Sequence, residues 1–101
     1  MTTKITLIID NPADPEVFEQ AYPALLDAAR RLPELRRLES AKVWPKEDGT
    51  PTPASRTLDL YFDDYAAASA AVTTPEAGEL FGGLAGTGTS ITGLFSDVEE
   101  P

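Results

Sequence analysis

The sequence predicts an α+β fold, in which strands and helices follow in the order β, α, β, β, α, β and the strands form a four-stranded antiparallel sheet. Two observations predict it. Strand-like segments occur at 5–9, 35–44, 56–62 and 89–98, with period-two alternation in the first and third, and helix-capping signals occur in the intervals 10–34 and 63–88. The 101 residues suit one core, so residues 1–101 are expected to form a single domain.

The first strand and the first helix are separated by a change of periodicity. Residues 5–9 alternate with period two, which is typical of a strand. Asp14 is placed to cap a helix whose first turn holds Pro15. Pro23 inside this helix predicts a kink or a split into two helices. Apolar residues at helical spacing are predicted to face the core: Phe18, Tyr22, Leu25, Ala29 and Leu32.

The next two strands flank a proline-rich loop. Leu35 to Trp44 is predicted as the second strand, and the loop at 45–53 holds three prolines and a glycine. The third strand, from Arg56 to Phe62, is the clearest in the chain, because its residues divide between two faces. One face carries Leu58, Leu60 and Phe62, and the other carries Thr57, Asp59 and Tyr61.

The last third of the chain completes the pattern. Asp63 or Asp64 is predicted to cap a short alanine-rich helix, and Thr74 with Pro75 is predicted to open another. Glycines at 82, 83, 86 and 88 are expected to end that helix in a flexible turn, and Thr89 to Val98 is predicted as the fourth strand. The resulting order is the split-βαβ, or ferredoxin-like, arrangement.

Large apolar side chains occur on both faces of the predicted sheet. Ile8 opposes the other isoleucines of the first strand, Tyr61 lies opposite the leucines of the third, and Leu94 and Val98 oppose Phe95. The face without helices is therefore expected to be covered by a second copy of the sheet, giving a two-fold symmetric barrel. A monomer with a few exposed apolar residues is the alternative.

Composition excludes several classes of function. The net charge of −9 argues against nucleic acid and against anionic membranes as partners. The chain has no cysteine and no histidine, so disulfides, thiol nucleophiles and imidazole bases or ligands are excluded. The acidic residues lack calcium-loop spacing, and neither a metal nor a cofactor is predicted. No targeting segment is visible, so a cytoplasmic location is expected.

Three segments of the chain resemble the EthD family of dimeric α/β-barrel proteins. Phe18 and Tyr22 followed by residues 28–35, which end in Leu-Pro-Glu-Leu, resemble its first helix and the exit from it. Residues 58–63, with the sequence Leu-Asp-Leu-Tyr-Phe-Asp, resemble its third strand, and residues 73–78 resemble the step that opens its last helix. The resemblance covers nearly the whole chain in the right order.

This resemblance implies a homodimer that acts on small organic molecules or assists their breakdown. Similar barrels include muconolactone isomerases, quinone-forming monooxygenases and haem-degrading enzymes. The chain departs from the family at two positions: the histidine of the first helix would fall at Leu25 or Leu26, and Glu34 replaces the glycine of the helix exit. Any chemistry that depends on that histidine cannot be carried over.

Asp59 and Tyr61 are the candidate catalytic residues, because they share one strand face about 7 Å apart. In a barrel cavity, burial could raise the carboxyl pKa towards that of a general base, and the phenol could donate to an oxyanion. The alternative is that Asp59 pairs with Arg56 or with a cation of the partner, and that Tyr61 only packs.

Tyr22 and Trp44 are the candidate ligand-pocket residues. Tyr22 could point its hydroxyl into a gap at the Pro23 kink, or be buried with one satisfied hydrogen bond. Trp44 could cover a pocket or cap the edge of the core. Two functions remain open: a cofactor-free oxidoreductase, isomerase or cyclase on a small, mostly apolar compound of a catabolic or secondary-metabolite pathway, or a non-catalytic ligand-binding or accessory dimer in such a pathway.

Overall fold

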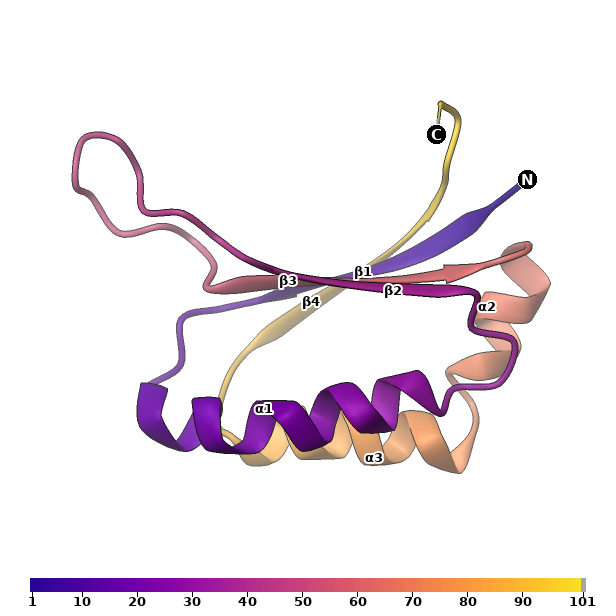
Figure 1. Ribbon diagram of the computed structural model, residues 1–101, viewed down its shortest axis with the longest axis horizontal. Helices are drawn as coiled ribbons and strands as arrows, with labels where there is room; N and C mark the ends of the chain where they lie inside the picture. Colours follow the sequence, from indigo (N-terminus) through magenta and orange to yellow (C-terminus); the bar gives the residue numbers. More distant parts are fainter. Residues whose placement is uncertain (101) are drawn as a thin grey trace.

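Four strands and three helices make up the described part of the chain, residues 1–100, in the computed structural model (Figure 1). Their order is β1 (Thr3–Ile9), α1 (Pro15–Arg30), β2 (Arg37–Lys42), β3 (Arg56–Phe62), α2 (Tyr65–Ala71), α3 (Pro75–Gly86) and β4 (Ile91–Asp97). The strands lie in the order β2-β3-β1-β4, and all neighbouring strands are antiparallel. The predicted ferredoxin-like fold is confirmed.

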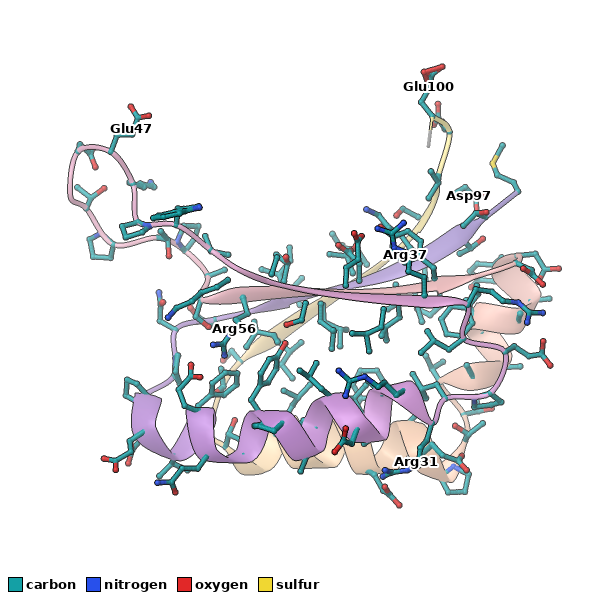
Figure 2. The ribbon with its side chains drawn as sticks, viewed as in Figure 1. Arg31, Arg37, Glu47, Arg56, Asp97 and Glu100 are labelled. Carbon is teal, nitrogen blue, oxygen red and sulfur yellow. The ribbon has the colours of Figure 1, made fainter. Side chains whose placement is uncertain are left out.

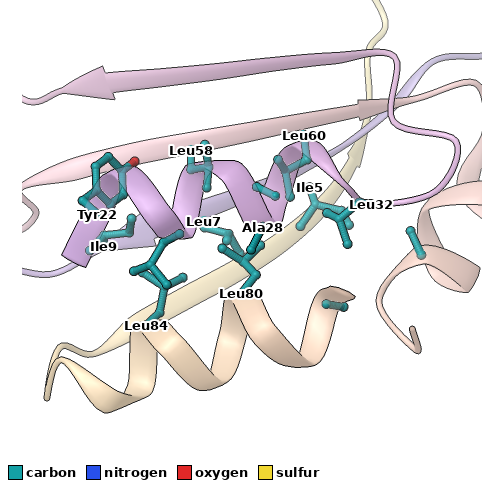
Figure 3. Packing of buried hydrophobic residues seen from close by; sticks show 14 of the residues in the cluster. Ile5, Leu7, Ile9, Tyr22, Ala28, Leu32, Leu58, Leu60, Leu80 and Leu84 are labelled. Carbon is teal, nitrogen blue, oxygen red and sulfur yellow. The ribbon is translucent and has the colours of Figure 1, made fainter. Parts of the chain in front are cut away.

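The helices cover one face of the sheet, and the core lies between the two layers (Figure 1). All five positions of the first helical segment that were predicted to face the core are buried. They meet the inward side chains of β1 and β3 and the apolar face of α3 (Figure 3). The fully buried apolar residues of the strands are Ile5, Leu7, Ile9, Leu58, Leu60 and Phe62.

Helix α1 begins as predicted and continues past its internal proline. The Asp14 carboxylate accepts a hydrogen bond from the Val17 amide at 3.2 Å, and Pro15 occupies the first turn. The alternative of two helices split at Pro23 is wrong, because α1 is one continuous helix of 16 residues. Proline removes one backbone hydrogen bond, while Tyr22 and Leu25 on either side of it are held in the core. None of the helices within residues 1–100 combines the length and the apolar character that a membrane-spanning segment needs.

Helix α3 also extends further than predicted. The glycines at 82 and 83 lie inside it, Gly86 is its last residue, and the chain turns only at Gly88, where φ is +73°. Gly83 faces Leu25 of α1, and a Cβ atom at this position would collide with the Leu25 side chain. The prediction that the glycines end the helix is confirmed for Gly86 and Gly88 and wrong for Gly82 and Gly83, which lie inside it. At Gly83 the missing side chain lets two helices approach closely.

Glu34 lies in the turn that joins α1 to β2, and its φ of +64° is in the left-handed region. A residue with a Cβ atom adopts this conformation at a cost of about 1–2 kcal/mol, whereas glycine adopts it freely. The EthD-like exit motif has glycine at this position. The backbone of the turn therefore has the conformation that glycine favours, although the chain places glutamate there.

Glu34→Gly is expected to raise the free energy of unfolding by about 0.5–1 kcal/mol. The gain comes from released strain, and the lost ion pair with Arg36 is solvent-exposed and contributes little. Urea unfolding of both proteins measures the difference. Glu79→Gly is the control, because Glu79 is an exposed helical residue and glycine there should destabilise the chain. A destabilised Glu34→Gly protein would contradict the prediction.

Strand β2 is shorter than the predicted segment at both ends. Its partner strand β3 begins at Arg56, and after Val43, whose amide donates a hydrogen bond to the Ser55 carbonyl, the chain leaves the sheet. The loop that follows rises on the side of the sheet opposite the helices, where both termini also lie (Figure 1). Trp44 is the first residue of this departure, so it has no strand beside it.

The strand register arranges the helix-free face, hereafter the outer face, in three rows across the four strands. The first row is Ser96, Lys4, Tyr61 and Arg37; the second is Leu94, Thr6, Asp59 and Glu39; the third is Thr92, Ile8, Thr57 and Ala41. Apolar residues are therefore scattered among polar ones. The two cations and two carboxylates of these rows make the outer face neutral in a chain of net charge −9.

Candidate functional site

Tyr61 lies at the centre of a polar cluster on the outer face. Its hydroxyl donates a hydrogen bond to the Glu39 carboxylate at 2.5 Å. Its ring lies 5.9 Å from the Lys4 ammonium and 5.5 Å from the Arg37 guanidinium. Arg37, which extends on the side of the sheet away from the helices (Figure 2), also contacts Glu39 at 2.6 Å. Tyr61 of β3 thus contacts both neighbouring strands, β1 through Lys4 and β2 through Arg37 and Glu39.

Asp59 lies beside this cluster and contacts two side chains of β1. The Thr6 hydroxyl donates to its carboxylate at 2.5 Å, and the Lys4 ammonium lies 3.8 Å away. The expected pairing of Asp59 with Arg56 is wrong, because positions three apart on a strand point to opposite faces. Arg56 extends to the helix side of the sheet (Figure 2).

The pKa values of the cluster follow from the hydrogen bond between Tyr61 and Glu39. This bond stabilises the carboxylate and holds the pKa of Glu39 below its usual value. The same bond, together with burial, raises the pKa of the Tyr61 phenol. The phenol proton is committed to Glu39, so Tyr61 would have to leave this partner before it could donate to a substrate oxyanion.

A hollow of about 540 Å³ lies beside the Tyr61 cluster on the outer face. Its walls come from β1, β2, β3, the connection before β2 and the two ends of the chain: Thr2, Lys4, Arg36, Arg37, Glu39, Tyr61, Val98 and Glu100. Most of these side chains are polar, as a catalytic site would require. Asp59 is not among these residues, so the hollow includes only one of the two candidate catalytic residues.

Tyr61→Phe is expected to raise the pKa of Glu39 towards its usual value, because the variant loses the bond that stabilises the carboxylate. In the native protein that bond contributes stability at neutral pH, which is lost as the pH falls through the lowered pKa of Glu39. Carboxyl carbon shifts followed by NMR titration measure the change. Tyr65→Phe, on α2, is the matched control and should leave the titration of Glu39 unchanged.

Tyr22 connects α1 to β2 on the opposite side of the sheet. It is 5% exposed, and its hydroxyl is 2.8 Å from the Ser40 hydroxyl. Its ring stacks on Phe18 with the ring centres 5.1 Å apart. Burial raises the pKa of Tyr22, and the hydrogen bond with Ser40 lowers it. The structure therefore places Tyr22 as a buried tyrosine with one satisfied hydrogen bond.

Trp44 is 87% exposed and lies at the base of the β2–β3 loop. The expectation that it caps the edge of the core is wrong, because the chain has already left the sheet at this point. A second hollow, of about 490 Å³, is lined by Lys42, Val43, Trp44 and Pro45. The structure does not bring together Trp44, Tyr22 and Tyr61: they lie in the loop, on α1 and on the outer face.

Sequence reasoning missed three residues of the Tyr61 cluster, namely Lys4, Arg37 and Glu39. Strand alternation could have assigned Lys4 to the outer face with Thr6, since both have the parity opposite to Ile5. The contacts of Arg37 and Glu39 with Tyr61 depend on the register of β2 against β3, which no local pattern specifies. Within residues 1–100, no three acidic side chains are placed to hold a metal ion.

Several known proteins resemble this chain, although no family model matches it. An uncharacterised 11.0 kDa protein from the thcB–thcC intergenic region of Rhodococcus erythropolis is 29% identical over 98 residues, which cover 95% of this chain and 94% of that protein. An EthD family protein from Bacillus halodurans superposes with a TM-score of 0.86 at 19% identity, over 97% of this chain and 99% of its own. The fold is EthD-like.

Other proteins with the EthD-like fold differ in what is known of them. SnoaB from Streptomyces nogalater, a cofactor-independent oxygenase, superposes with a TM-score of 0.66 at 13% identity, over 99% of this chain and 94% of its own. Three further structures with TM-scores of 0.69, 0.70 and 0.71 are described as dimeric proteins. The EthD-like fold is thus shared by an enzyme and by proteins without a known activity.

Proposed function

We propose that this EthD-like chain works in the cytoplasm as a homodimer that binds and transforms a small, mostly apolar organic compound without a cofactor. The observation that carries the proposal is the hydrogen bond between Tyr61 and Glu39, in a hollow flanked by Lys4 and Arg37. The reaction would be that of an oxidoreductase, isomerase or cyclase. SnoaB, which has this fold, is a cofactor-independent oxygenase.

The outer face has the properties needed for association with a second copy. Its four charged residues are paired within the chain, so covering them would leave no charge without a partner. Leu94, in the middle row of this face on the edge strand β4, is 50% exposed. Dimerisation would remove it from water and enclose the hollow around Tyr61. Similar proteins described as dimeric support this proposal.

In the enzyme, Tyr61 would leave Glu39 and donate a hydrogen bond to a developing oxyanion, and Asp59 would act as the general base. Enclosure by a partner would strengthen the electrostatic interactions of the cluster. The second candidate function is a non-catalytic ligand-binding or accessory dimer. It is favoured by the fact that Asp59 and Tyr61 already have partners within the chain, Thr6 and Glu39.

Native mass spectrometry of the freshly purified protein tests the proposal. A mass of twice 10.8 kDa, about 21.6 kDa, with an added few hundred daltons would support a dimer that retains a ligand. A monomer would contradict the homodimer. Once the retained compound is known, turnover that is lost in both Tyr61→Phe and Asp59→Asn supports the enzyme. Binding without turnover in the native protein supports the accessory role.

A further inference from the structure

Arg56 occupies an unusual position on the helix side of the sheet. It is the first residue of β3, and its guanidinium lies between the sheet and α1 (Figure 2). The guanidinium carbon is 4.6 Å from the ring centre of Tyr22 and 5.5 Å from that of Phe18. The side chain is only 13% exposed. Arg56 is therefore a largely buried cation held against two aromatic rings.

The hydrogen-bonding capacity of Arg56 is incompletely used. Its Nη2 atom contacts the Glu19 carboxylate at 2.9 and 3.0 Å, whereas its buried Nη1 atom has no hydrogen-bond partner. A buried charged donor without a partner is costly. Glu19 extends from α1 and its side chain is 55% exposed, so this carboxylate lies at the surface and can be displaced.

A second cation faces Arg56 across the strands. Lys42 of β2 is directly opposite Arg56 of β3 in the antiparallel register, and like charges in this position repel each other. Both cations act on Glu19, whose pKa is lowered by the hydrogen bond with Arg56 and also by the charge of Lys42. Only Arg56 contacts Glu19, and Lys42 acts on it through its charge alone, so the three groups together carry one positive charge in a chain of net charge −9.

We propose that Arg56 and Lys42 bind the carboxylate of a small organic acid, which takes the place of Glu19 on the guanidinium. A planar guanidinium matches a carboxylate with two parallel hydrogen bonds. The surplus of one positive charge favours a monoanion over a doubly charged phosphate. The hydroxyl of Ser40, which is exposed beside Tyr22, lies two residues from Lys42 on the same strand face and can contact the body of the ligand.

This inference goes beyond the proposed function, because Arg56 and Lys42 lie on the helix side of the sheet and the Tyr61 cluster lies on the outer face. The residues concerned belong to α1, β2 and β3 of one chain, so the site is complete without a partner. Carboxylate binding can therefore be measured whether the protein is a monomer or a dimer. Failure of the dimer and failure of this site are separate results.

Titration with benzoate, followed by amide NMR shifts, tests the site. Glu19→Gln removes the competing carboxylate and should tighten benzoate binding about tenfold, because benzoate no longer has to displace a charged partner from Arg56. Glu16→Gln is the matched control, because it removes the same charge from the exposed first turn of the same helix. It should leave the affinity within about twofold of the native value, because surface charges act weakly at a distance.

The loss-of-function variants are Arg56→Gln and Lys42→Gln. Each should weaken benzoate binding about tenfold or more. Lys42 is exposed, so its variant remains informative if Arg56→Gln fails to fold. The proposal is overturned if native and Glu19→Gln proteins both fail to bind benzoate at millimolar concentration, or if Glu19→Gln and Glu16→Gln respond equally. Equal binding of neutral benzamide, or tighter binding of inorganic phosphate, would overturn the carboxylate class.

Discussion

Leu58→Ala is expected to lower the free energy of unfolding by about 2–5 kcal/mol, the range for a leucine truncated in a packed core. Leu58 is fully buried, and it lies in the central part of the sheet between β2 and β1. The neighbouring elements are held by many other contacts, so the cavity cannot collapse completely. For a chain of this size such a loss is a large fraction of the total stability.

Urea unfolding at one fixed protein concentration measures this effect, because dimerisation would make stability depend on concentration. Thr57→Ala is the control. Thr57 is the adjacent residue of β3 and points to the outer face, so its truncation should cost about 1 kcal/mol or less. Similar losses for the two variants would contradict the assignment of these residues to opposite faces of the sheet.

Leu94→Asp is expected to convert the proposed homodimer to a monomer. Leu94 is half exposed on the outer face, on the edge strand β4 and directly opposite Thr6 of β1. In a two-fold symmetric dimer the substitution introduces one carboxylate from each copy, and neither has a cation left to pair with. Burial of unpaired charges costs several kcal/mol, so the dissociation constant should rise at least about 100-fold.

Val17→Asp is the matched control, because Val17 is 49% exposed but lies on α1, on the helix side of the sheet. Native mass spectrometry of both variants reports their assembly. Trp44, the only tryptophan in the chain, offers a second readout, since a partner that covers it would shift its emission to shorter wavelength. A dimer retained by Leu94→Asp but lost by Val17→Asp would place the interface on the helices.

Much of the fold was predictable because local patterns specify it. The bounds of β3 agree with the predicted segment, since alternation over Arg56–Phe62 is uninterrupted. The caps at Asp14, Asp64 and Thr74 were predictable because each side chain accepts a hydrogen bond from a backbone amide three residues ahead. The errors at Pro23 and in the glycines of α3 arose where packing between helices outweighed local propensity.

The candidate site was less predictable than the fold. Tyr61 and Asp59 could be assigned to one face from their spacing, but their partners come from other strands. Glu39 and Lys4 reach Tyr61 and Asp59 only because β2 and β1 pair with β3 in one register. Arg56 gave no sequence signal of its own, since an arginine at a strand end is commonly solvated.

The sequence alone determined the order of strands and helices, the residues that face the core and the absence of histidine and cysteine chemistry. These properties depend on spacing and residue type, which are local. Only the tertiary structure decided that Tyr61 binds Glu39 and that Arg56 lies buried against Tyr22, opposite Lys42. Such contacts join residues distant in the chain, and they follow from strand register and from the packing of α1 on the sheet.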